Sequence, residues 1–144
     1  MQKAKQEFLA SKSLAVVGVS RTRGFGNEAF KALMKRGYTA YPVNSQADTV
    51  EGERCYRSLR DLPVLVDGVV VVVPPVQAER VVADCVSLGI RRVWLQQGAE
   101  SEAAIRLCHE NGIEPVTKSC IMMYAAPTGF HSFHRWVWKV LGRL

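Results

Sequence analysis

The sequence predicts an α/β fold in which helices cover both faces of an open parallel sheet. Short apolar runs alternate with helix-length segments along the chain, a rhythm typical of such sheets. The central run, Val69–Val73, is five valines, and β-branched residues suit a strand buried on both faces. A turn with Gly18, Gly24 and Gly26 joins the first apolar run to a helical segment, which is typical of phosphate-binding folds.

Each element has its own signal in the sequence. Five apolar segments are expected as parallel strands: Leu14–Val19, Thr39–Val43, Gly68–Val73, Arg92–Leu95 and Glu114–Thr117. Three segments with helical spacing are expected as helices: Asn27–Arg36, Gln77–Leu88 and Ser101–Glu110. Gly37 and Gly89 follow the first two helices, where a glycine commonly ends a helix. The segment Ser45–Leu65 has a looser pattern.

Length and composition predict one globular domain spanning residues 1–144. The chain is 48% hydrophobic and 22% charged, and its apolar runs are strand-sized, so we expect no transmembrane segment. The N-terminus lacks the apolar core of a signal peptide. The four cysteines form no C-x-x-C pair, so we expect no metal site and a reducing, cytoplasmic location.

The net charge of +6 calls for an anionic partner. Nucleic acid is one candidate, because basic faces follow phosphate backbones. The basic residues, however, are spread along the chain and accompany no RNA-binding motif. A small polyanion is therefore favoured, and no nucleic acid is expected.

The ends of the strands carry the candidate site, because ligands of parallel sheets bind outside the carboxyl ends of the strands. These positions hold glycines, prolines, amides, hydroxyls and a few cations, with no carboxylate. Asn44 stands where a nicotinamide site usually has an acid, which disfavours NAD; an NADP site using Arg21 or Arg23 stays open. No catalytic residue is predicted. Cys120, near Lys118, is a candidate nucleophile, although such a cysteine is more often a packed apolar residue.

Five segments, in order, resemble a known family. They are AVVGVSRTRGFGNEAFKALMKRGYTAYPVNSQ, GERCYRSLRDLP, VDGVVVVVPP, GIRRVWLQQGAESE and GIEPVTKSCIMM. Together they resemble the small single-domain CoA-binding proteins, which are similar to the N-terminal CoA-binding domain of the succinyl-CoA synthetase alpha subunit. The resemblance implies a Rossmann-like three-layer sandwich and coenzyme A as the ligand.

The resemblance also implies which residues contact CoA. The first loop would wrap the pyrophosphate, the end of the second strand would lie beside the adenosine, and the later strand ends would follow the adenine and pantetheine. The candidates are Gly18, Val19, Ser20, Arg23, Asn27, Pro42, Val43, Asn44, Val73, Pro74, Pro75, Gln97 and Gly98. Many small members carry Phe-Arg after the third strand, where this chain has Val73-Pro74-Pro75 and so lacks a cation.

Two functions of different classes follow. The favoured one is a non-catalytic carrier, sensor or regulatory module that binds CoA or an acyl-CoA at the strand ends. The alternative is an enzyme, either an NADP-linked oxidoreductase or a CoA-thioester enzyme using Cys120. A C-terminal segment at about 130–142 has apolar residues at helical spacing. We expect an amphipathic helix there, docked on the sheet or available for a homodimer or another protein partner.

Overall fold

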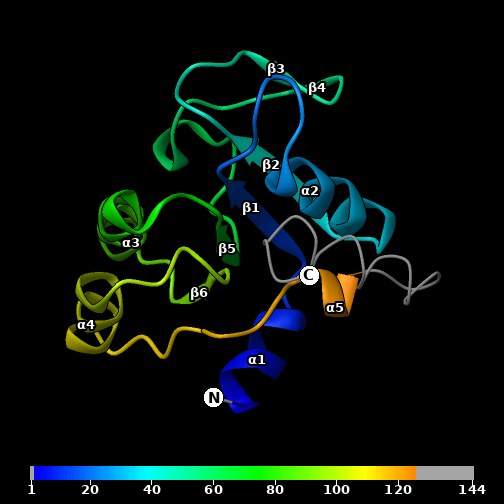
Figure 1. The fold of residues 1–144 in the computed structure, drawn as a ribbon. Coiled ribbons are helices and arrows are strands. Elements are labelled where there is room, and N and C mark those ends of the chain that lie inside the picture. Colours follow the sequence, from blue (N-terminus) through cyan, green and yellow to red (C-terminus); the bar gives the residue numbers. More distant parts are fainter. Residues whose placement is uncertain (1, 126–144) are drawn as a thin grey trace.

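A parallel sheet with helices on both faces forms the centre of the computed structural model, which describes residues 2–125 (Figure 1). The four strands of this sheet are β1 (Ser13–Val17), β2 (Thr39–Val43), β5 (Gly68–Val71) and β6 (Arg92–Leu95). Their order is β2-β1-β5-β6, and every neighbouring pair is parallel. The four strands expected first along the chain are therefore confirmed, with the first and third shorter at their carboxyl ends.

The prediction of a fifth strand at Glu114–Thr117 is wrong. Only Val116 pairs with β6, in a single parallel bridge to Trp94. The Val116 nitrogen donates to the Val93 carbonyl at 2.9 Å, and its carbonyl accepts from the Leu95 nitrogen at 2.8 Å. Glu114 and Lys118 are the next residues whose backbone groups would face β6, and neither makes a backbone hydrogen bond to it. Beyond the bridge, Lys118 takes a positive φ of 57°, which turns the chain out of the extended conformation.

Within residues 2–125, five helices flank the sheet (Figure 1). They are α1 (Gln2–Leu9), α2 (Phe25–Lys35), α3 (Pro75–Leu88), α4 (Glu102–Glu110) and α5 (Met122–Ala125). The three expected helices are confirmed, and α2 and α3 each begin two residues earlier than expected. Within residues 2–125 no helix combines the length and apolarity needed to cross a membrane.

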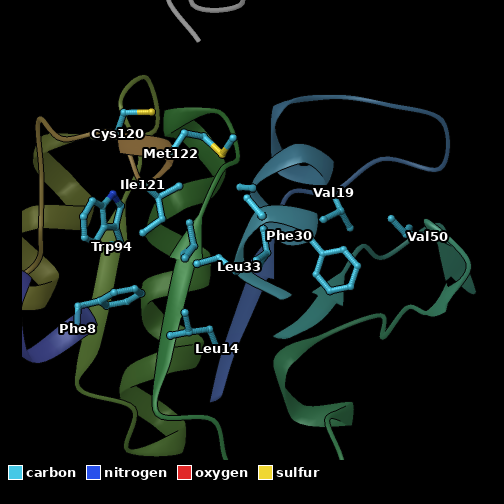
Figure 2. Close-up of a cluster of buried hydrophobic side chains, with 14 of the residues drawn as sticks. Phe8, Leu14, Val19, Phe30, Leu33, Val50, Trp94, Cys120, Ile121 and Met122 are labelled. Atoms are coloured by element: carbon cyan, nitrogen blue, oxygen red, sulfur yellow. The ribbon is translucent and has the colours of Figure 1, made fainter. Parts of the chain in front are cut away.

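Alternation along the strands sends side chains to two separate cores. One face buries Leu14, Val16 and Val70 beneath α1, α2 and α5, and the opposite face buries Ala15, Val17 and Val69 beneath α3 and α4. In the first core the ring of Trp94 contacts the ring of Phe8, with 5.3 Å between the ring centres (Figure 2). It also contacts the ring of Tyr124, at 5.6 Å. Phe8 belongs to α1, a helix that the sequence did not predict.

The looser segment after β2 forms small elements at the top of Figure 1. A two-stranded hairpin joins β3 (Thr49–Val50) to β4 (Glu53–Arg54), and a short 3₁₀ turn, η1, spans Leu59–Asp61. Neither was predicted. The expected C-terminal helix at about 130–142 lies outside the described residues.

Candidate functional site

The order of the strands reverses between β1 and β5. The chain places β2 on one side of β1 and then places β5 on the other side. Such a switch point opens a crevice at the carboxyl ends of the strands. A cavity of about 570 Å³ lies there, between the ends of β1, β2 and β5 and helix α3. Five of the predicted residues line it: Gly18, Val43, Asn44, Val73 and Pro74.

Gly18 permits the tight packing at the end of β1. Its φ is +121°, and a Cβ atom at this position would overlap the Val72 carbonyl oxygen of the neighbouring chain segment. Gly26 is also confined, since a Cβ there would lie 2.6 Å from the Gly18 carbonyl oxygen. The loop and the first turn of α2 therefore lie against each other through bare backbone, which only glycines allow.

Two asparagines hold the loop between β1 and α2 in place. Asn27, which is 1% exposed, accepts a hydrogen bond from the Ser20 nitrogen at 2.6 Å and donates to the Ser20 carbonyl at 2.8 Å. Asn44 donates from its amide to the Val19 carbonyl at 2.6 Å. Both were predicted as ligand contacts, and the structure gives both side chains a positioning role. Val19 is buried and does not line the cavity.

The N-terminus of α2 is left uncapped by any side chain. Its N-cap residue is Gly24, which makes no side-chain hydrogen bond. The nitrogens of Gly26 and Asn27 in the first turn donate to no acceptor among residues 2–125. Helix N-termini with unpaired N–H groups attract anions through these donors and the helix dipole. Arg21 and Arg23 lie exposed in the adjoining loop.

One lysine forms ion pairs with two carboxylates near this helix start. Lys31 lies 2.7 Å from Glu28 and 3.5 Å from Glu51. Glu51, at the turn of the β3–β4 hairpin, also accepts a hydrogen bond of 3.0 Å from the Asn27 amide. This hydrogen bond, together with Lys31, holds the pKa of Glu51 below its ordinary value. The hairpin is thereby fastened to α2 and to the glycine loop.

Several residues that line the cavity were missed by the sequence analysis. Arg57 and Ser58 reach it because Tyr56 forms a parallel bridge to Val43 at the edge of β2. Helix α3 contributes Gln77, Arg80, Val81 and Asp84. The spacing of these four residues puts them on one helical face, a signal that identifies the face but not what it is packed against.

The end of β6 lies apart from this cavity, and Gln97 and Gly98 do not line it. Glu100 organises that region: its carboxylate accepts from the Gly98 nitrogen at 3.1 Å and from the Lys118 nitrogen at 2.7 Å. The expectation that the strand ends hold no carboxylate is therefore corrected. Glu100 is two residues beyond Gly98 in sequence, and only the turn brings it back.

All four cysteines are buried free thiols. Cys120 is 6% exposed, and burial is the main cause that raises its pKa. Burial also raises the pKa of Cys85 to about 12 and that of Cys108 to about 11. A thiol with a raised pKa is protonated near neutral pH and is a weak nucleophile. These environments do not support nucleophilic chemistry at Cys120.

A second cavity, of about 590 Å³, lies near the amino ends of β1 and β2, at the opposite end of these strands from the first cavity. It is lined near the start of β2 by Arg36, Tyr38 and Thr39, and across from them by Leu9 and Tyr124. It is as large as the first but is remote from the glycine loop and the switch point. The geometry that favours phosphate is found at the first cavity.

The fold and the site together define an α/β domain with a glycine-containing loop and an uncapped helix N-terminus at its switch point. The chain belongs to the CoA binding domain family, whose model matches residues 12–126. Among curated proteins it is similar to the alpha subunit of the ADP-forming acetate–CoA ligase II of Pyrococcus furiosus, with 26% identity over 126 residues. That alignment covers 79% of this chain and 28% of the ligase subunit, so the chain spans little more than a quarter of that relative.

The chain also resembles proteins of solved structure, and these matches cover nearly the whole length of the other protein. A conserved hypothetical protein from Pyrococcus furiosus is 39% identical, with a TM-score of 0.74. The match covers 78% of this chain and 98% of that one. A hypothetical protein from Pyrococcus horikoshii is 27% identical, with a TM-score of 0.78 and coverage of 98% and 92%.

Proposed function

We propose that this protein binds coenzyme A or an acyl-CoA at the carboxyl ends of its parallel strands, as a non-catalytic carrier, sensor or regulatory module. The observation that carries the proposal is the uncapped N-terminus of α2, facing a glycine loop that Asn27 and Asn44 hold in place beside the cavity. Membership of the CoA binding domain family supports the same ligand.

The residues present fit the anionic part of CoA. Its pyrophosphate would be bound by the backbone amides of Gly26 and Asn27, with Arg23 supplying an exposed cation. Pro42 and Val43 place Asn44 at the edge of the cavity, where the adenosine would lie. Each helix-dipole or exposed-cation contact contributes on the order of 0.3–1 kcal/mol. Several contacts and a buried adenine reach about −8 kcal/mol, which is a micromolar site.

The remaining predicted contacts extend the same ligand path. Val73, Pro74 and Pro75 would flank the adenine and the start of the pantetheine, and Gln97 with Gly98 would lie near its far end. A cytoplasmic location, where CoA is found as a free thiol, fits the four reduced cysteines. The absence of a reactive thiolate at Cys120 favours binding without chemistry.

Calorimetric titration tests the proposal with five ligands at one salt concentration: CoA, acetyl-CoA, NAD, NADP and ATP. We expect micromolar affinity for CoA and much weaker binding of both nicotinamide nucleotides. Ser20→Ala should weaken CoA binding, since the Ser20 hydroxyl accepts a hydrogen bond from the Thr22 nitrogen within the loop. Tight NADP binding without a CoA response would overturn the proposal and indicate an oxidoreductase.

A further inference from the structure

The part of the cavity away from the glycine loop is lined by charged side chains. Arg57 comes from the segment beside β2, and Arg80 and Asp84 come from α3. Gln77, Arg80, Val81 and Asp84 are spaced at i, i+3, i+4 and i+7, so one face of α3 forms this wall. A ligand with its pyrophosphate at the α2 N-terminus and its adenosine in the cavity would bring its ribose toward this wall.

Two of the three arginines in and beside this wall already form an ion pair with a carboxylate, and the third does not. Arg57 donates to Asp48 at 2.9 Å, and Arg60, within η1, lies 3.9 Å from Asp84. Arg80 is exposed and makes no ion pair or hydrogen bond with any residue from 2 to 125. Because Arg60 offsets the charge of Asp84, Arg80 is the cation at this wall that is available to an anionic group.

The residues that line the cavity directly after β5 supply no positive charge. Val73 and Pro74 line the cavity at this point, and neither bears a charge. Coenzyme A carries a phosphate monoester on its ribose in addition to the pyrophosphate. A guanidinium binds phosphate through paired, charge-assisted hydrogen bonds, which a helix N-terminus already engaged by the pyrophosphate could not supply.

We propose that Arg80 binds the 3′-phosphate of the ligand and makes this protein select CoA over 3′-dephospho-CoA. The inference rests on the proposed function and adds a specificity-determining residue to it. Arg80 lies on α3 and takes no part in holding the glycine loop, so affinity for the rest of the molecule does not depend on it.

The test is a titration of wild type, Arg80→Gln, Arg80→Lys, Arg57→Gln and Arg106→Gln with CoA, with 3′-dephospho-CoA and with NADP. Arg106 is a matched control, since it is exposed on α4 and does not line the cavity. We expect wild type and Arg106→Gln to bind CoA about tenfold more tightly than dephospho-CoA. Arg80→Gln should bind both ligands alike, at the wild-type affinity for dephospho-CoA, and Arg80→Lys should keep part of the preference.

Four results would overturn the inference. An unchanged preference in Arg80→Gln would do so while leaving CoA binding intact. Loss of the preference in Arg57→Gln but not in Arg80→Gln would assign the phosphate to the other arginine. Wild type that binds neither CoA form refutes the proposed function as well, and wild type that prefers NADP over both assigns the wall to a ribose 2′-phosphate.

Discussion

At the scale of single residues, Gly18 has the most constrained position in the site. It combines a positive φ with backbone packed where a Cβ would be, whereas Gly37 has a similar φ of +104° and open space around it. A substitution at Gly37 therefore measures the free-energy cost of the positive φ alone. A substitution at Gly18 adds the cost of the steric overlap.

We expect Gly18→Ala to be the more damaging substitution. Gly37→Ala should cost about 1 kcal/mol for its φ alone, and Gly18→Ala about 2 kcal/mol more, because the end of β1 must move away from Val72. Urea unfolding of both variants measures the difference, and CoA titration should show a loss for Gly18→Ala only. Equal destabilisation would contradict the packing that we describe.

At the scale of elements, α1 and the β3–β4 hairpin support the sheet and the loop respectively. Helix α1 places Phe8, which is 1% exposed, edge-on against Trp94 on one face of the sheet. The hairpin places Glu51 against Asn27, the residue that holds Ser20. One side chain of each element therefore makes the contact that we test: Phe8 from α1 with the sheet, and Glu51 from the hairpin with Asn27.

Phe8→Ala should destabilise the protein by about 3–5 kcal/mol, because it removes a buried ring and leaves a cavity beside Trp94. Val76→Ala serves as the control, since Val76 is 88% exposed, and should change the free energy of unfolding by less than about 0.5 kcal/mol. Denaturant unfolding measures both values. A Phe8→Ala variant as stable as the control would show that α1 is not docked on the sheet.

The link between Glu51 and Asn27 should depend on pH. The pKa of Glu51 is lowered in the folded protein, so its stabilising contribution is present above the ordinary glutamate pKa. The contribution is lost as the pH falls through the lowered, folded-state pKa. In NMR spectra, the side-chain amide signals of Asn27 should shift over that acidic range in wild type and stay constant in Glu51→Gln. A shift that persists in Glu51→Gln would assign the titration to another group.

At the scale of the whole molecule, the sheet order explains why the site forms where it does. The reversal between β1 and β5 leaves their carboxyl ends open, and the loop after β1 and the wall of α3 close two sides of the same cavity. Residues distant in the sequence, such as Gly18, Arg57 and Arg80, meet there through the topology.

Much of this arrangement could be predicted, because the strands are marked by β-branched residues and the helices by their spacing. The bounds of β2 and β6 agree with the sequence prediction. Helix α1 was missed because Gln2–Leu9 is short and polar apart from residues such as Phe8, whose burial depends on Trp94 far along the chain. Arg80 was missed because the face that α3 turns to the cavity depends on packing.

The most direct test of the central claim is an NMR titration of the ¹⁵N-labelled protein with CoA, read residue by residue. We expect the largest changes in amide chemical shift at Gly18 to Asn27, at Val43 to Gln46 and along the α3 wall around Arg80. Shifts concentrated instead at Leu9, Tyr38 and Tyr124, around the second cavity, would contradict the central claim, as would the absence of any shift.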